Sequence, residues 1–136
     1  MAQQLSIVKV SIVTNQSLGR AGEDAAVSFL KGRGYRILKR NFKCRLGEVD
    51  IIARDGETYC FVEVKTRNSD KFGLPQEAVS NSKQRQISKA ALAYLKDNNL
   101  LNEKARFDVV SILFSDKEPK PDLIKNAFEL GGNYVV

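Results

Sequence analysis

Residues 47–65, GEVDIIARDGETYCFVEVK, contain two stretches rich in β-branched and aromatic residues, separated by the dipeptide Asp55-Gly56. Such residues favour strands, and Asp-Gly is a preferred sequence for a tight hairpin turn. The segment therefore predicts two paired antiparallel strands, at 48–54 and 58–65, and these strands carry most of the acidic residues discussed below.

The turn also predicts which side chains share a face of the hairpin. Counted from a two-residue loop at Asp55-Gly56, Asp50 lies opposite Phe61. The same count places Glu48 opposite Glu63. A three-residue loop would move one strand's side chains to the other face, so the prediction depends on the parity of the loop. With an even loop, alternation puts four residues on one face: Glu48, Asp50, Glu63 and Lys65.

Three carboxylates crowded on adjacent strands would repel one another, so we expect a compensating cation between them. Mg²⁺ or Mn²⁺ fits, because hard divalent cations prefer oxygen ligands. We expect Asp50, Glu63 and Glu48 to bind the metal, and Lys65 to orient an attacking water and stabilise charge on a phosphate. The alternative is a solvated sheet face on which alternating charges only aid solubility.

Residues 18–31 carry apolar side chains at three- and four-residue spacing, which predicts an amphipathic helix ended by Gly32 and Gly34. On this helix Glu23 lies at the border of the apolar stripe. A carboxylate at the border can face the end of a sheet, so Glu23 is a further candidate metal ligand and catalytic residue.

The remaining pattern predicts one α/β domain at 17–136, preceded by an extension, 1–16, that could add a strand. Asp108, inside a predicted strand, is either a buried hydrogen-bonding carboxylate or an auxiliary site residue. The predicted elements are a helix at 18–31, strands at 35–39, 48–54 and 58–65, a helix at 77–97, a strand at 106–114, a charged loop at 116–121 and a short last helix at 123–130.

Composition narrows the chemistry. The 136 residues contain 22 Lys and Arg against 16 Asp and Glu, a net charge of +6 that favours polyanionic partners. The absence of histidine excludes imidazole bases, Ser-His-Asp catalysis and histidine-ligated zinc. Cys44 and Cys60 are too few for a four-thiolate zinc site and suggest a reducing compartment.

Without a long apolar segment near the start, we expect a cytoplasmic protein that does not enter a membrane.

Basic and polar residues near the predicted site are candidates for contacts with a phosphate backbone, although each could equally be solvent-facing. They follow the second hairpin strand or begin the second helix: Arg67, Lys71, Lys83, Gln84 and Arg85. DNA is the expected partner.

Several segments together resemble the YraN family, uncharacterised bacterial proteins similar to archaeal Holliday-junction resolvases of the PD-(D/E)xK nuclease superfamily. The resemblance spans roughly Gly19 to Phe128. The matching segments are GRAGE at 19–23, GYRIL at 34–38, NF at 41–42, GEVDIIA at 47–53, FVEVKTR at 61–67, KQR at 83–85 and RFDVV at 106–110.

The resemblance implies a restriction-endonuclease-like fold, a mixed central sheet flanked by helices in the order α-β-β-β-α-β. It places Asp50, Glu63 and Lys65 in the motif positions and Glu23 as the helical acid. It implies a metal-dependent endonuclease acting on DNA, with branched or junction DNA as a candidate substrate and a homodimer left open. The alternative is a non-catalytic nucleic-acid-binding or adaptor protein that keeps the fold. An RNA-directed nuclease is a third reading.

Overall fold

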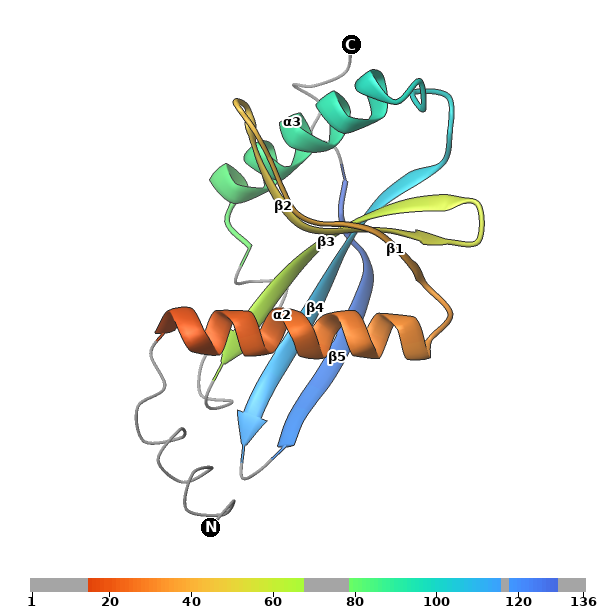
Figure 1. Cartoon of the computed structure of the whole chain (residues 1–136). Helices are drawn as coiled ribbons and strands as arrows, with labels where there is room; N and C mark the ends of the chain where they lie inside the picture. The colour runs from red at the N-terminus through yellow and green to blue at the C-terminus, as the bar shows by residue number, and fades with distance from the viewer. Residues whose placement is uncertain (1–14, 68–78, 116–117, 130–136) are drawn as a thin grey trace.

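A mixed five-stranded sheet carries one helix on each face in the computed structural model, which describes residues 15–67, 79–115 and 118–129 (Figure 1). The elements are α2 (Asn15–Gly32), β1 (Arg36–Cys44), β2 (Gly47–Asp55), β3 (Thr58–Arg67), α3 (Asn81–Asp97), β4 (Ala105–Ser115) and β5 (Glu118–Phe128). The predicted α/β class is confirmed, and the architecture is consistent with a restriction-endonuclease-like fold. The candidate N-terminal strand lies outside the described residues.

The strands follow one another across the sheet in the order β1-β2-β3-β4-β5. Neighbouring strands are antiparallel except β3 and β4, which are parallel. Parallel neighbours need a crossover connection, and α3 lies in the connection between them. The hairpin that was predicted from Asp55-Gly56 is therefore joined to a crossover unit, which makes the sheet mixed.

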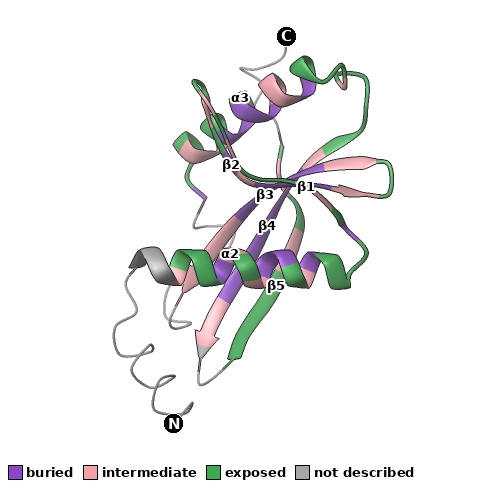
Figure 2. Cartoon of the chain, viewed as in Figure 1, coloured by how far each residue is buried: buried purple, intermediate pink, exposed green. Residues whose placement is uncertain are grey.

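Side-chain alternation along the strands builds two apolar cores, one on each face of the sheet (Figure 2). On β3, Cys60 and Val62 pack on the α2 side, whereas Phe61 packs on the α3 side. Glu63 and Lys65 continue the spacing of Phe61, so they project towards the side that carries α3. The same alternation on β4 places Val110 against α2 and Val109 against α3.

The hairpin register differs by two residues from the predicted one. The last pair before the turn is Asp55 with Thr58, so Gly56 and Glu57 form the loop. Gly56 adopts a positive φ of 61°, which suits glycine, and Asp55 is held in the strand by Arg106. A shift of two keeps the parity of the loop, so Glu63 and Lys65 lie on the predicted face of β3. In β2 the alternation breaks beside Asp50, because Val49 and Ile52 both pack on the α3 side, and the single face predicted for all four residues does not extend to Glu48 and Asp50.

The predicted short helix at 123–130 is wrong, because β5 occupies this region as an antiparallel edge strand on β4. Ile124, Ala127 and Phe128 have the i, i+3, i+4 spacing of a helix, and all three pack on the α3 side. A bulge produces this spacing, since the β4–β5 register shifts there and Asn126 has a positive φ of 53°. The predicted loop at 116–121 is likewise partly strand.

Neither described helix is long and apolar enough to cross a membrane. The two helices are amphipathic, with one side against the sheet and the other exposed (Figure 2).

Candidate active site

The strands β2 and β3 separate at Asp50. Their pairing runs from Asp55 back to Ile51, which faces Val62, and the register carried one residue further places Asp50 opposite Glu63. At this point the Asp50 carboxylate Oδ2 accepts the backbone N–H of Val64 at 2.8 Å. A side chain thus satisfies an N–H that lies beyond the paired residues of the two strands, and it holds the Asp50 carboxylate beside Glu63.

Glu63 is a buried carboxyl group, only 4% exposed, at the α3 side of the sheet. Burial above all, together with the negative charge of Asp50 and a hydrogen bond with Asp50, raises its pKa to about 8. Lys83 and Lys65 lower the pKa, but they offset only part of this effect. Asp50 and Glu63 therefore lie together in a site that is largely shielded from water, where the positive charge of the two lysines does not fully compensate their negative charge.

Two lysines approach the Glu63 carboxylate from different elements. Lys65 Nζ lies 3.6 Å from Glu63 Oε2, two residues along the same strand. Lys83 Nζ, from the first turn of α3, lies 3.8 Å from the same oxygen. The predicted grouping of Asp50, Glu63 and Lys65 is thus present in the geometry, and Lys83 joins it.

Glu48 is exposed and reaches this group through Lys83, whose Nζ lies 3.9 Å from Glu48 Oε1. Gly47 explains why α3 comes so close to β2, because an added Cβ there would overlap the backbone carbonyl oxygen of Gln86. A glycine at the start of β2 therefore determines the spacing between Glu48 and the first turn of α3. Nothing in the sequence indicated that Gly47 would pack against Gln86.

Glu23 lies on the α2 side, where its carboxylate accepts hydrogen bonds from Arg40 Nε at 3.1 Å and Asn41 Nδ2 at 2.9 Å. The β1–β2 register places Asn41 opposite Asp50, so Glu23 borders the site through β1. Gly22 lets α2 approach β3 closely, since a Cβ there would overlap the hydroxyl of Thr66. The Glu23 contacts run to β1, and those of Glu48 run to α3.

The candidate nucleic-acid residues fall into different surroundings. Lys83 is committed to the two glutamates, and Gln84 Nε2 donates to the backbone oxygen of Val79 at 2.9 Å. Arg85 is exposed on α3, and Arg67 is half-buried at the end of β3. Lys71 lies outside the described residues. The predicted group therefore contains one open basic side chain on α3, not three polar side chains of equal availability.

Exposed basic residues on β1 were not among the sequence candidates, although their spacing was visible. They lie along the edge strand and in the turn that follows it: Arg36, Lys39, Lys43 and Arg45. They form a basic edge that continues into β2 at Gly47, three residues before Asp50. The signal was the repetition of basic residues between positions 36 and 45.

A second group of charges, the Arg106 cluster, consists of Arg106, Asp108, Asp55 and Tyr35. Arg106 Nε contacts both carboxylate oxygens of Asp108, at 3.0 and 3.1 Å. A terminal nitrogen of Arg106 binds Asp55 at 2.8 Å and the Tyr35 hydroxyl at 2.7 Å. Asp108 is fully buried and also accepts the backbone N–H of Asn126. Of the two readings of Asp108, the hydrogen-bonding carboxylate is the one the geometry matches.

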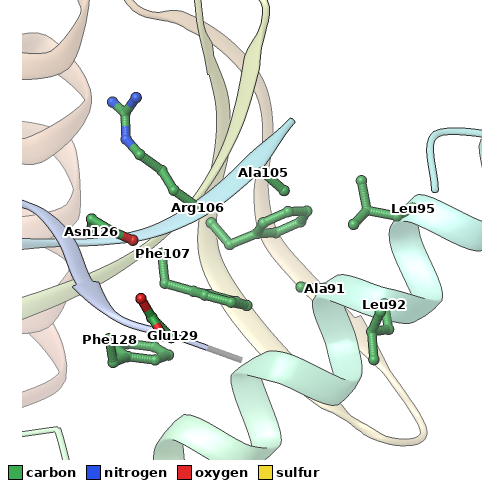
Figure 3. Close-up of a pocket in the computed structure, with 10 residues that line it drawn as sticks. Ala91, Leu92, Leu95, Ala105, Arg106, Phe107, Asn126, Phe128 and Glu129 are labelled. Atoms are coloured by element: carbon green, nitrogen blue, oxygen red, sulfur yellow. The ribbon is translucent and has the colours of Figure 1, made fainter. Parts of the chain in front are cut away.

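A cavity of about 310 Å³ lies between α3 and the edge formed by β4 and β5. Its lining is mainly apolar, with aromatic side chains of Phe107 and Phe128 stacked beside α3 (Figure 3). The Arg106 side chain points away from α3 in this view, towards its own cluster (Figure 3). Neither Asp50 nor Glu63 lines the cavity, so it is separate from the carboxylate site.

Within the described ranges no three Asp, Glu or Cys side chains form a group that could hold a metal ion by themselves. The protein donors that lie together are the two carboxylates of Asp50 and Glu63. Mg²⁺ commonly uses one or two carboxylates and completes its octahedron with waters and phosphate oxygens. This donor set therefore fits a hard divalent cation that is bound together with a phosphate.

Bacterial proteins with more than half of their aligned residues identical resemble this chain over most of its length. A protein of Geobacter metallireducens named "UPF0102 protein" is 58% identical over 116 residues, covering 85% of this chain and 95% of that protein. One of the same name from Geotalea uraniireducens is 59% identical over 117 residues, covering 85% and 92%.

Among solved structures, the crystal structure of SSO0001 is similar at 20% identity and a TM-score of 0.39, covering 94% of this chain and 60% of that one. The match that extends over residues 22–112 is to a sequence family. This match and the two close relatives confirm the family expected from the YraN resemblance, and the chain belongs to the Uncharacterised protein family UPF0102.

Proposed function

We propose that this chain is a metal-dependent nuclease that hydrolyses phosphodiester bonds of DNA at the Asp50–Glu63 site. The observation that carries the proposal is the pair of adjacent carboxylates at the point where β2 leaves β3. One of them is buried, and burial with the neighbouring charge raises its pKa to about 8. A folded protein that places two acids together in this way gains from a bound cation.

The donor chemistry supports Mg²⁺ or Mn²⁺ as that cation. Asp50 Oδ2 accepts one N–H, from Val64, and an ionised carboxylate has about four lone-pair sites, so it can also bind a cation. Glu63 would provide the second ligand. A bound divalent ion would supply positive charge for the phosphate oxygens and for the attacking water.

Lys65 contributes a positive charge at the same place. Its Nζ is 3.6 Å from Glu63, and its side chain is half-exposed, so it can meet a phosphate that approaches the carboxylates from solvent. Its ammonium would stabilise negative charge that develops on the phosphate during hydrolysis. An ammonium held by a rigid central strand needs little reorganisation for this role.

Charge on the surface supports a polyanionic substrate. The net charge is +6, and the basic edge of β1 leads along the strand into β2 and towards Asp50. Arg85 adds an exposed positive charge on α3. Contacts of this kind position a phosphate backbone without reading base sequence.

The test is cleavage of linear, flapped and four-way DNA by wild type, Asp50→Ala and Glu63→Ala, with Mg²⁺, Mn²⁺ or EDTA. Glu57→Ala, an exposed acid in the turn of the same hairpin, is the matched control. We expect metal-dependent cleavage by wild type and the control, and loss of cleavage in the two site variants. Faster cleavage of four-way DNA by a dimeric protein would identify junctions as the substrate, because that reaction needs two active sites.

Equal cleavage by the wild type and both site variants would refute the assignment. Salt-sensitive DNA binding without cleavage in all variants would favour a non-catalytic adaptor. This second reading has one observation in its favour, since Lys65 and Lys83 already place positive charge at Glu63 without a metal. A parallel assay with single-stranded RNA separates DNA from RNA as the substrate.

A further inference from the structure

One ammonium group is shared between two carboxylates at the start of α3. Lys83 Nζ lies 3.8 Å from Glu63 Oε2 and 3.9 Å from Glu48 Oε1, nearly equal distances. The two acids differ in their surroundings, because the side chain of Glu63 is 5% exposed and that of Glu48 is 49% exposed. Lys83 therefore links a buried acid of the candidate site to an acid at the surface.

The position of Lys83 on its helix makes this link unusual. The first turn of a helix carries the positive end of the macrodipole, where acidic residues are favoured and cations are not. The first turn of α3 contains no acidic residue, and Ser80 provides the N-cap by accepting the Lys83 backbone N–H at 3.1 Å. A lysine here depends on the two glutamates for its electrostatic stabilisation.

Close backbone packing fixes the distance between Glu48 and the first turns of α3. Gly47 packs against the backbone of Gln86, so β2 and α3 are in direct contact next to Glu48. Because Glu48 is the residue after Gly47, its carboxylate stays beside the first turn of α3. Because Lys83 Nζ already lies 3.9 Å from Glu48, the lysine can keep this partner when Glu63 pairs with another cation, and the backbone need not move.

We propose that Lys83 is a positioning residue whose ammonium group occupies the position of the divalent cation beside Glu63 in the metal-free protein. When the cation binds, Lys83 gives up its ion pair with Glu63 and keeps its ion pair with Glu48. The inference rests on the proposed function, and it assigns Glu48 a role as acceptor for the lysine instead of metal ligand. No covalent step is involved, since one ion pair is replaced by another.

Electrostatic repulsion explains why Lys83 would leave Glu63 for Glu48 when a cation binds. A divalent ion between Asp50 and Glu63 would repel an ammonium a few ångströms away, and repulsion in a partly buried place is poorly screened. Glu48 offers an acceptor of opposite sign within reach. The lysine thus competes with the metal for Glu63, whereas Glu48 weakens that competition.

The test measures Mn²⁺ affinity by calorimetry in wild type, Lys83→Met, Glu48→Gln and the double variant. We expect Lys83→Met to bind Mn²⁺ roughly three- to tenfold more tightly, because the competing cation is gone. Glu48→Gln should bind roughly two- to fivefold more weakly, because Lys83 then has Glu63 as its remaining acidic partner. The double variant should bind Mn²⁺ with the same affinity as Lys83→Met. Arg85→Met, on the same helix, is the control for loss of one positive charge.

Weaker or unchanged binding in Lys83→Met would overturn the proposal. A Glu48→Gln effect that persists in the Lys83→Met background would also overturn it, because Glu48 would then act as a metal ligand. Absence of Mn²⁺ binding in every variant would do the same. Thermal unfolding of each metal-free variant shows whether the variant is folded. Failure of the nuclease proposal can be told apart from failure of this one, because the protein would then bind Mn²⁺ but not cleave DNA.

Discussion

The Arg106 cluster and the Asp50–Glu63 site both place acidic groups in or beside the core, but they balance the charge in different ways. Asp108 is fully buried and receives two contacts from one guanidinium at 3.0 and 3.1 Å, together with a backbone N–H. Glu63 is almost as buried, yet its nearest lysine nitrogens lie at 3.6 and 3.8 Å. The first arrangement is electrostatically complete, whereas the second is incomplete, because the two lysines offset only part of the rise in the pKa of Glu63.

The pKa values express the same contrast. Burial and the charge of Asp108 together raise the pKa of Tyr35 to about 12, so the phenol stays neutral at ordinary pH, donates to Asp108 and accepts from Arg106. Burial likewise raises the pKa of Cys60 to about 12, which keeps this thiol unreactive. At Glu63 a raised pKa of about 8 falls near physiological pH instead. Perturbed groups of this kind mark functional sites more often than structural ones.

Breaking the Arg106 cluster should have the largest effect on folding. Arg106→Leu leaves Asp108 buried without its guanidinium, and we expect the free energy of unfolding to fall by about 3–5 kcal/mol. Urea denaturation measures the loss. Asp108→Asn in the same background should recover part of it, because an amide is neutral. A loss below 1 kcal/mol for Arg106→Leu would mean that Asp108 is stabilised by other groups.

Glu63→Gln should sharpen the contrast through its pH dependence. The folded-state pKa of Glu63, about 8, lies above its ordinary value of 4.5, so this group's contribution to stability is fully present below 4.5 and is lost as pH rises through 8. Metal-free wild type should therefore become less stable between pH 5 and pH 9. A glutamine cannot ionise, and at pH 9 Glu63→Gln should be more stable than wild type by about 2–3 kcal/mol.

The control for this comparison is Glu57→Gln, an exposed position in the turn of the same hairpin. It should follow the wild-type pH dependence of unfolding throughout the range. Parallel curves for Glu63→Gln and wild type would show that Glu63 ionises in the folded protein as it does in the unfolded chain.

Gly47→Ala should have the smallest of the three effects and a local one. Its Cβ would overlap the Gln86 carbonyl oxygen, so β2 and α3 must move apart. We expect a loss of about 1–2 kcal/mol in the free energy of unfolding, typical of overpacking. Mn²⁺ affinity should also change, because Lys83 moves with α3. Gly32→Ala, which meets open space at the end of α2, is the control and should change neither quantity substantially.

The sequence predicted much of this arrangement because it depends on local patterns. The Asp-Gly turn and the alternating residues gave the hairpin, and an even loop gave the correct face for Glu63 and Lys65. The register was displaced by two residues because Asp55 stays in the strand through its bond to Arg106, a residue 51 positions away. A contact over that separation leaves no local signal in the sequence.

Other features escaped prediction for the same reason. The bulge at Asn126 gave β5 the apolar spacing of a helix, and only pairing with β4 reveals it as a strand. Lys83 was a candidate for phosphate contact, but its link to Glu48 and Glu63 follows from the packing of Gly47 against α3. Periodicity identifies the faces of elements, whereas the approach of two elements depends on the whole fold.

The most direct test of the contrast between a complete and an incomplete charge group is stabilisation by Mn²⁺. Binding to the folded protein alone raises the free energy of unfolding by about 2.7 kcal/mol at a metal concentration one hundred times the Kd. We expect this gain in thermal or urea unfolding of wild type, and its loss in both Asp50→Asn and Glu63→Gln. Equal stabilisation of all three proteins by Mn²⁺, or none of wild type, would contradict the assignment of Asp50 and Glu63 as a metal site.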